Sequence, residues 1–351
     1  MRCVWTKLVT EADEVHGKPC SRSSHGLSYL HAGGKLILYG GEHIARTPLD
    51  GDQAAWALSL TTTTTTTTTT DDSKGNPKWR KLPDGPPSRI AHAQAVHKGN
   101  TLFVFGGRGG ITMSEKPFND MWKLNCETEV WEELQCKGEA PEPRSFHKMV
   151  CLGDSLYVFG GCGPSGRLAD LYRYDINEST WHALGKSPLL RGRGGANLIV
   201  LQEGNALGIV GGFAGEETAD GHVYDLVTNK WSESLLDYTT DENMMRPRSV
   251  SACAPLSSKN RVVIFGGEVD PSDRGHEGAG GFTNDIVILD NTAGGVVQTI
   301  IASGENWPES RGWSDATVNT EGRIFLYGGL TGDDANPRRL DDLWQCEFLP
   351  E

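Results

Sequence analysis

The sequence has no long apolar run, no excess of positive charge and no cysteine pair of the Cys-x-x-Cys type. No stretch approaches the ~18 consecutive apolar residues of a membrane-spanning helix, and the N-terminal residues lack the apolar core of a secretory signal. Lys and Arg number 33 against 46 Asp and Glu, a net charge of −13, so nucleic acid and membranes are not expected partners. The eight cysteines are expected to be free thiols in a reducing compartment. These absences predict a soluble protein of the cytoplasm, or also of the nucleus, that is not secreted.

Hydrophobic residues are scarce as well, at 37%, whereas glycine is abundant, with 44 residues. Many turns and short strands produce this balance. A short apolar strand that ends in Gly-Gly, such as Arg261-Val-Val-Ile-Phe-Gly-Gly267, occurs six times. The second glycines of the six pairs are Gly41, Gly107, Gly161, Gly212, Gly267 and Gly329. Their spacings of 66, 54, 51, 55 and 62 residues indicate one supersecondary unit that is repeated and that needs its neighbours to bury its faces.

Each unit has the same internal order of strands. An arginine precedes a strand of small residues, a tight turn leads to the Gly-Gly strand, and a polar loop leads to a third strand with period-2 alternation. After another turn, the fourth strand opens on a tryptophan in four of the units (Trp79, Trp131, Trp181 and Trp231). Four antiparallel strands in a unit of this length describe a propeller blade. We therefore predict an all-β protein, a six-bladed β-propeller in which residues 1–351 form a single domain.

The two ends of the chain predict how the ring closes. The last unit stops after residue 348 without a fourth strand, whereas residues 4–8 have the pattern of a fourth strand without a blade. We expect Trp5 to complete the last blade, which would leave only short, protected strand edges. The first unit also carries ten consecutive threonines from Thr61, and we predict a disordered insertion over residues 61–76. The fifth unit has Val297 where a tryptophan is expected.

The Gly-Gly pair, the third strand and the tryptophan after a short turn together resemble the Kelch repeat, and the resemblance covers almost the whole chain. In such a blade the residues before the first strand and those after Gly-Gly share one face of the disc. The former include an arginine in every unit (Arg22, Arg89, Arg144, Arg193, Arg248 and Arg311). One interpretation is a ring that attracts anions, with Arg89, Arg144 and Arg193 as candidate anion-holding residues of a catalytic site. In the other, these arginines tie blades together through loop carbonyls.

Three histidines, His25, His92 and His147, each lie three residues after such an arginine. Because they fall inside a repeated strand, we interpret them as packing residues rather than as catalytic or metal-binding ones.

The least repetitive stretch is the loop of residues 267–281 in the fifth unit. It supplies Glu268, Asp270, Asp273, His276 and Glu277 within ten residues. Carboxylates with one imidazole suit Fe(II) or Mn(II) better than a metal that prefers thiolates. The alternative is a polar surface loop without a metal.

This loop, with residues 161–171, 191–195 and 212–217, resembles the plant specifier proteins: the nitrile-specifier, epithiospecifier and thiocyanate-forming proteins. The resemblance implies an Fe(II) cofactor and the redirection of the unstable aglucone that myrosinase releases from glucosinolates. The family's iron ligands follow a Glu-x3-Asp-x3-His pattern, which Glu268 and His276 match at its outer positions. Ser272 occupies the middle position and Asp273 is next to it, so the implied metal ligands are Glu268, Asp273 and His276.

Three functions remain open on these grounds. The first is an Fe(II)-dependent site on the loop face for a small anionic, thiohydroximate-type molecule, with an activity of the lyase or isomerase type. The second is a non-enzymatic Kelch scaffold that holds a protein partner on the same face, because a fold does not fix a function. The third is a metal-free activity of the sugar-acid mutarotase type that uses the arginines and histidines. We expect a monomer in each case.

Overall fold

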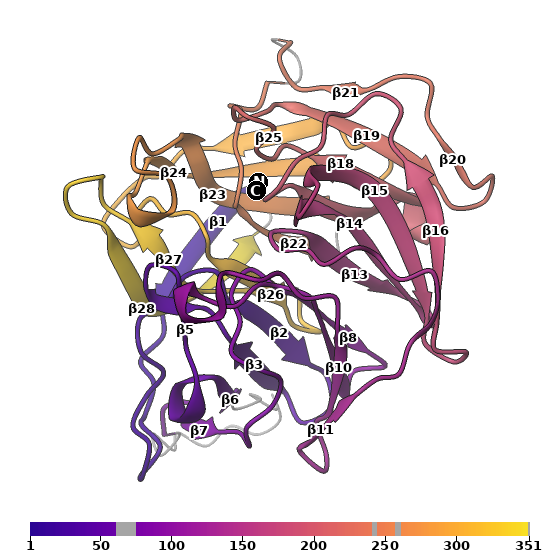
Figure 1. The fold of residues 1–351 in the computed structure, drawn as a ribbon. Helices are drawn as coiled ribbons and strands as arrows, with labels where there is room; N and C mark the ends of the chain where they lie inside the picture. The colour runs from indigo at the N-terminus through magenta and orange to yellow at the C-terminus, as the bar shows by residue number, and fades with distance from the viewer. Residues whose placement is uncertain (61–74, 241–243, 257–260, 350–351) are drawn as a thin grey trace, which may run out of the picture.

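Six antiparallel sheets surround a central channel in the computed structural model, which describes residues 1–60, 75–240, 244–256 and 261–349 (Figure 1). The innermost strands of the sheets contact one another in a closed cycle, β2, β8, β13, β17, β22, β26 and again β2. The all-β, six-bladed propeller is therefore confirmed.

The strands of each blade follow one another outward from the channel. Blades one and two contain β2 (Gly26–Leu30), β3 (Lys35–Tyr39), β6 (Ala55–Ser59) and β7 (Trp79–Lys81), then β8 (Ala93–His97), β9 (Thr101–Phe105), β10 (Met121–Asn125) and β11 (Val130–Glu133). Blades three and four contain β13 (Lys148–Leu152), β14 (Ser155–Gly163), β15 (Gly166–Asp175) and β16 (Thr180–Lys186), then β17 (Asn197–Leu201), β18 (Ala206–Val210), β19 (Asp220–Asp225) and β20 (Lys230–Trp231). Blades five and six contain β22 (Ala252–Leu256), β23 (Arg261–Asp270), β24 (Gly281–Asp290) and β25 (Val296–Ile300), then β26 (Asp315–Val318), β27 (Ile324–Thr331), β28 (Arg338–Leu349) and β1 (Arg2–Lys7).

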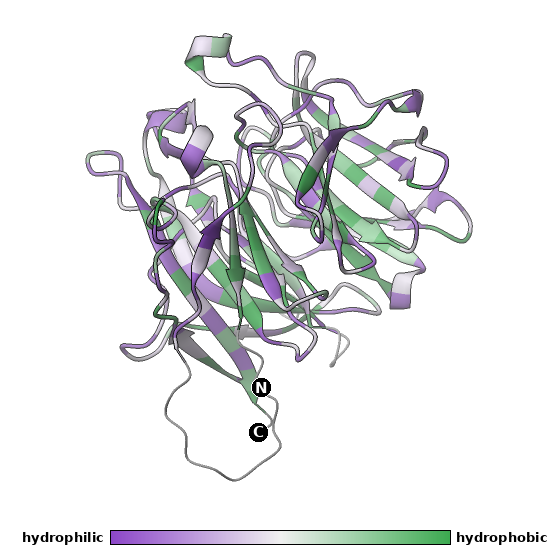
Figure 2. Cartoon of the chain, turned by 90° about the horizontal axis from the view of Figure 1, so that it is seen from below, coloured by the Kyte–Doolittle hydropathy of each residue, from purple (hydrophilic) through white to green (hydrophobic). Residues whose placement is uncertain are grey.

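Short accessory strands extend three of the blades. The pair β4 (Glu42–Ile44) and β5 (Thr47–Pro48) forms a hairpin after the first Gly-Gly strand. The two-residue strands β12 (Lys137–Gly138) and β21 (Leu236–Asp237) pair with β16 and β19. Hydrophobic residues concentrate on the strands, and much of the connecting chain is hydrophilic (Figure 2).

The Gly-Gly pairs are required by the backbone at the exit of each second strand. In blade one, Gly40 and Gly41 have φ values of +65° and +93°, in the region that side chains disfavour. A Cβ atom on Gly41 would lie 2.7 Å from the Ser23 carbonyl oxygen. The close approach of the first strand therefore leaves no room for a side chain.

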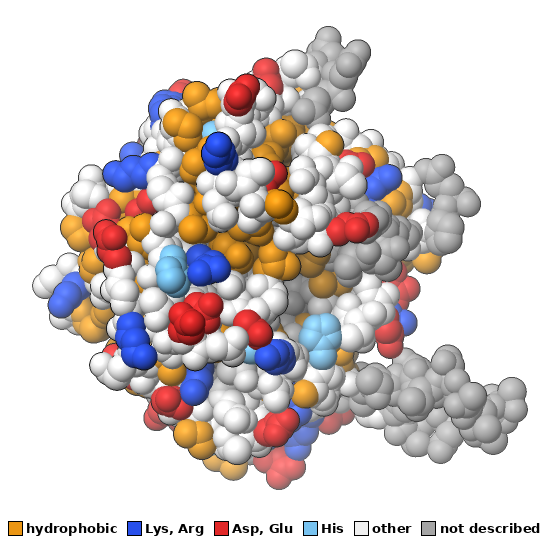
Figure 3. Space-filling view, turned by 90° about the vertical axis from the view of Figure 1, so that its right-hand side faces the viewer, with side chains coloured by type: hydrophobic (Ala, Val, Ile, Leu, Met, Phe, Trp, Pro, Cys, Tyr) orange, Lys and Arg blue, Asp and Glu red, His pale blue; other side chains and the backbone are white. Residues whose placement is uncertain are grey.

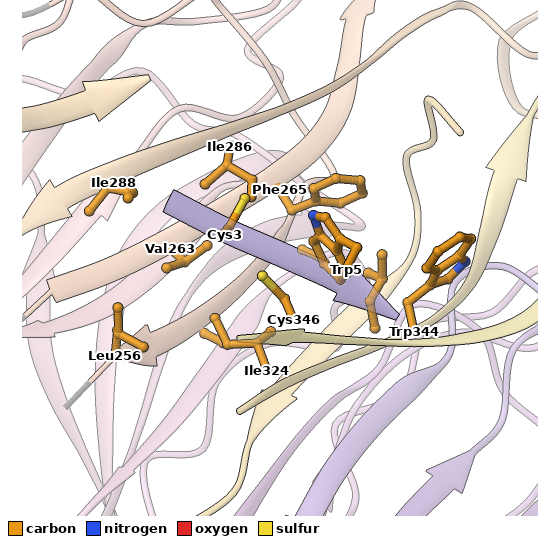
Figure 4. Packing of buried hydrophobic residues seen from close by; sticks show 13 residues of the cluster. Cys3, Trp5, Leu256, Val263, Phe265, Ile286, Ile288, Ile324, Trp344 and Cys346 are labelled. Carbon is orange, nitrogen blue, oxygen red and sulfur yellow. The ribbon is translucent and has the colours of Figure 1, made fainter. Parts of the chain in front are cut away.

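The N-terminal strand closes the ring. β1 pairs with β28 in antiparallel register, with Trp5 opposite Cys346, as the sequence predicted. Trp5 is 4% exposed, and its ring centroid lies 5.2 Å from that of Phe265 on the neighbouring blade and 6.5 Å from that of Trp344 (Figure 4). The closing strand thus contributes to the core between blades five and six.

The remaining predictions about the chain have mixed outcomes. The predicted insertion at 61–76 lies outside the described residues, apart from residues 75 and 76. All eight cysteines are described, and each is free. In the described part of the chain, no helix is long and apolar enough to cross a membrane. Basic, acidic and hydrophobic side chains are intermingled on the face in Figure 3.

Candidate functional site

The six repeated arginines lie inside the wall of the propeller. Each is at most 1% exposed and donates a hydrogen bond to the carbonyl of the first glycine of its own blade. Five of them also form two-pronged ion pairs with an aspartate near the third strand (Asp120, Asp170, Asp220, Asp285 and Asp342). The carbonyl of each arginine accepts from the second Gly-Gly amide of the preceding blade.

These contacts correct the interpretation of the arginines as an anion-attracting ring. The guanidinium groups of Arg89, Arg144 and Arg193 are fully buried and already paired with carboxylates. An external anion would have to open a buried ion pair to reach them, which costs several kcal/mol. The alternative interpretation, in which the arginines tie the blades together, matches the contacts.

A closed ring of hydrogen bonds defines the mouth of the channel on the loop face. Two residues after each arginine, the backbone has a left-handed φ between +45° and +63°. Each of these residues donates its amide to the carbonyl of its equivalent in the preceding blade, over 2.8 or 2.9 Å, until the cycle closes. The six are Ser24, Ala91, Phe146, Gly195, Val250 and Trp313, and all line the mouth. A left-handed backbone is strained for a β-branched residue such as Val250. The hydrogen bonds of the ring hold Val250 in this conformation.

The three repeated histidines lie just below this ring and pack between blades. Their rings make edge-to-face contacts with an aromatic residue of the preceding blade, at 5.1–5.5 Å between centroids. His147 Nε2 lies 3.1 Å from the Phe105 carbonyl oxygen, and His92 Nε2 lies 3.3 Å from Gln94 Oε1. Burial lowers the pKa of His92 to about 3, so this imidazole is neutral at pH 7. The contacts match the packing role predicted for these residues.

The loop after β23 lies across the mouth. Its short helix η6 (Gly275–Glu277) places the ring of His276 4.8 Å from that of Trp313 and 5.9 Å from that of Phe146. Phe146 and Trp313 belong to blades three and six and are themselves 5.4 Å apart. One loop of blade five therefore meets two opposite blades over the channel entrance.

A buried carboxylate in blade one holds the histidine of this loop. His276 Nε2 lies 3.1 Å from Glu42 Oε1, and Arg339 Nη2 donates to the same oxygen over 3.1 Å. Burial would raise the pKa of Glu42, but the hydrogen bond from His276 and the charges of His276 and Arg339 bring that pKa below its ordinary value. A charged Glu42 thus has two cationic or hydrogen-bonding partners that arrive from blades five and six.

Asp334, from the β27–β28 loop, organises the rest of the loop. Its carboxylate accepts hydrogen bonds from the Ser272 hydroxyl and from the amides of Asp273 and Ala279, the latter two over 3.1 Å. Arg274 donates to the Asp334 carbonyl over 2.6 Å. Ser272, which stands at the middle position of the expected metal motif, is therefore occupied in fixing the loop.

The predicted metal ligands are not brought together. His276 binds Glu42, the backbone amide of Asp273 binds Asp334, and Glu268 lies against the Ser272 and Gly280 amides. Within the described residues, no group of three His, Cys, Asp or Glu side chains is arranged to hold a metal ion. This donor set does not fit Fe(II), which needs several nitrogen or oxygen ligands converging on one point.

Two buried carboxyl groups beside the loop keep a proton near neutral pH. Burial raises the pKa of Glu268, which is 8% exposed, to about 7. Burial also raises the pKa of Glu217 to about 8, and the charge of Glu268 contributes to that shift. Neither carboxylate oxygen of Glu217 has a hydrogen-bond partner. Carboxyls with pKa values near 7 are suited to donate or accept protons.

Arg108 supplies positive charge at the mouth. It follows the second Gly-Gly pair, and its guanidinium carbon lies 5.0 Å from the centroid of the Phe146 ring. Its Nε has no hydrogen-bond partner in the described structure, whereas the Nε of each of the six wall arginines donates to a backbone carbonyl. Arg108 is therefore a better candidate than the wall arginines for holding an anionic group at this mouth.

The sequence indicated part of this site. It placed Glu42, Arg108 and Glu268 on one face, because each follows a Gly-Gly pair. It missed the aromatic pair Phe146 and Trp313, although both stand two residues after a repeated arginine, a position that could have marked them.

The fold and this covered mouth define a six-bladed propeller with a candidate site at one end of its channel. A family model described as the KLHDC2/KLHL20/DRC7 Kelch-repeats domain matches residues 75–267. The chain belongs to this Kelch-repeat family.

Several known proteins are similar over much of the chain. The N-(sulfonatooxy)prop-2-enimidothioate sulfolyase of Thlaspi arvense is 28% identical over 355 residues, which cover 93% of this chain and 92% of that protein. Kelch domain-containing protein 10 of Homo sapiens is 27% identical over 72% of this chain but only 54% of its own length. The solved structure of YjhT has a TM-score of 0.66 at 19% identity, covering 93% of this chain and 95% of that one, and supports the fold alone.

Proposed function

We propose that the chain binds and converts a small, anionic, sulfated thiohydroximate-type molecule at the loop-face mouth. The observation that carries the proposal is the His276 loop. It covers an entrance lined by Phe146 and Trp313, with Arg108 against the Phe146 ring and, beside the loop, two carboxyls that hold protons near pH 7. The similarity to a sulfolyase along 92% of that protein's length supports this substrate class.

Each residue has a distinct task in this proposal. Arg108 pairs with the sulfonate oxygens, since a guanidinium matches the geometry of an oxyanion. Trp313 and Phe146 pack against the rest of the substrate and exclude water. Glu268, with a pKa of about 7, accepts the thiol proton of the substrate. Sulfate then leaves with the electron pair of the N–O bond, and the shape of the mouth directs how the remaining fragment rearranges.

The role of Fe(II), which the resemblance implies, stays a prediction, and the residues around His276 do not supply its ligand set. No step above passes through a metal. We therefore expect a chelator to leave the activity unchanged. Loss of activity with chelator, restored by Fe(II), would indicate that the loop rearranges to bind iron.

The test compares the products formed when the substrate is generated in the presence and absence of the protein. Mass spectrometry should show a product ratio that differs from the protein-free reaction. The ratio should return toward the protein-free value in Arg108→Met and Trp313→Ala. Arg191→Met is the matched control, because Arg191 is an exposed rim arginine that pairs with Glu216. An unchanged ratio with folded wild-type protein, with or without Fe(II), would rule out this function.

A further inference from the structure

An ion pair between opposite blades crosses the central channel beneath the mouth. Lys148 begins the inner strand of blade three and Asp315 begins that of blade six, the blade directly opposite. Lys148 Nζ lies 3.8 Å from Asp315 Oδ1, close enough for attraction but too long for a hydrogen bond. The side chains are 32% and 20% exposed, and both line the channel.

The space on the far side of this pair is a cavity of about 410 Å³. The inner strands of all six blades line it, from the level of His25 to that of His31 at the opposite face. A volume of this order is typical of a small-molecule site. Lys148 also lines the mouth, so the ion pair separates the two spaces.

Several polar atoms of the cavity lining lack a hydrogen-bond partner, namely ring nitrogens of His25 and His92 and the carbonyl oxygen of Asn197. Asn197 is 3% exposed and donates its amide nitrogen to Ser251 over 2.9 Å, while its carbonyl oxygen accepts no hydrogen bond. A buried amide oxygen that stays unpaired is costly. By contrast, Asp315 Oδ2 already accepts the Leu27 amide over 2.9 Å, which fixes the position of its carboxylate.

The balance of charge decides which ligand the cavity suits. Burial lowers the pKa of His25 and His92, so both are neutral at pH 7, and burial raises the pKa of the Cys151 and Cys253 thiols, which stay protonated. Lys148 and Asp315 then face each other as oppositely charged side chains, and His31 lines the exposed far end of the cavity. An anionic ligand would take Lys148 from Asp315, and a cationic ligand would take Asp315 from Lys148. In either case one charge of the partly buried lining loses its partner, which costs free energy.

We propose that this cavity binds a small zwitterion of the amino-acid or ω-amino-acid class, whose carboxylate pairs with Lys148 and whose ammonium pairs with Asp315. One loose ion pair is then replaced by two, and no charge is left alone. The ammonium has three donors, and the Asn197 carbonyl oxygen, which is shielded in the cavity wall, becomes a second acceptor once its side chain turns toward the ligand. The site is separate from the mouth and does not depend on the function proposed there.

The experiment uses probes that differ only in their charged ends. The zwitterionic probes differ in the distance between their charged ends: 3-aminopropanoate, 4-aminobutanoate, 5-aminopentanoate and 6-aminohexanoate. Pentanoate and pentylamine match 5-aminopentanoate in length but carry one charge each. Isothermal titration and thermal melting should show saturable binding of at least one zwitterion, at least tenfold tighter than either singly charged probe. The probes are titrated in 50-fold excess over the protein, up to roughly 10 mM free probe. If no zwitterion binds in this range, the proposal is overturned.

Two charge variants make the test specific. Lys148→Met and Asp315→Asn should each weaken zwitterion binding at least tenfold. They should shift the preference in opposite directions, toward pentylamine in the first and toward pentanoate in the second. The Asp315→Asn side chain keeps an acceptor for the Leu27 amide. If Asp315→Asn does not fold, Lys148→Met alone tests the site. Lys98→Met, which removes an exposed lysine paired with Asp154, is the control. Undiminished binding in Lys148→Met would refute the site.

Discussion

The ion pair between Arg144 and Asp170 offers a quantitative test of what holds each blade together. Arg144 is completely buried, and its two terminal nitrogens donate to the two Asp170 oxygens over 2.7 and 3.0 Å. Asp170→Ala leaves the guanidinium buried with only the Gly160 and Glu142 carbonyls as partners. Removing one member of a buried pair costs about 3–5 kcal/mol. We expect that loss in the free energy of unfolding, measured by urea denaturation.

The double variant Arg144→Met/Asp170→Leu separates the ion pair from the carbonyl contacts. It removes both charges, so the remaining cost comes from two unpaired carbonyls, about 1–3 kcal/mol each. Compared with the matching single variants Arg144→Met and Asp170→Leu, the sum of the two single losses should exceed the double loss, because each single variant strands a buried charge that the double variant removes.

Two control variants show how small the loss in the free energy of unfolding should be when a weaker contact is removed. Glu216→Ala breaks the exposed pair with Arg191 and should cost less than about 1 kcal/mol. Gln53→Ala removes the neutral partner that Arg22 has in place of an aspartate, and should cost about 1 kcal/mol. If Asp170→Ala costs no more than Glu216→Ala, the buried pairs are not what stabilises the blades.

Two further predictions concern packing and pH. Trp181→Ala should lower the free energy of unfolding, measured by urea denaturation, by about 3–5 kcal/mol. Trp131→Ala should lower it by less, because Trp181 is 2% exposed whereas Trp131 is only partly buried. Equal losses would contradict this reasoning. Glu217 has a folded pKa of about 8 and an unfolded one near 4.3, so its contribution to stability falls as pH rises between these values. Glu217→Gln should therefore raise the melting temperature more at pH 8 than at pH 5, and Glu216→Gln should change it at neither.

The fold could be predicted from the sequence because its signals are local and repeated. Each Gly-Gly pair reports a left-handed backbone that only glycine adopts readily, and six copies at similar spacing fix the number of blades. The pairing of Trp5 with the last blade followed from a strand missing at one end and present at the other.

The arrangement of the site was less predictable because its contacts join distant parts of the chain. His276 meets Glu42 at a separation of 234 residues, and Ser272 meets Asp334 at a separation of 62. The ligand motif suggested that Glu268 and His276 converge, but a buried carboxylate in another blade competes for the histidine. Likewise, the spacing of the repeated arginines did not indicate that five of them form ion pairs with aspartates near the third strands, which leaves them unavailable to an external anion.

The pairing of β1 with β28 has a consequence for the order in which the protein matures on the ribosome. β1 is synthesised long before its partner and has none until Arg338–Leu349 has left the exit tunnel. At roughly 5–20 residues per second, that delay is on the order of tens of seconds. Over this time Arg2–Lys7 is an unpaired strand edge beside five growing blades. Arg2, Thr6 and Lys7 occupy three of its four exposed positions, and their basic and polar side chains help to keep that edge from pairing with another nascent chain.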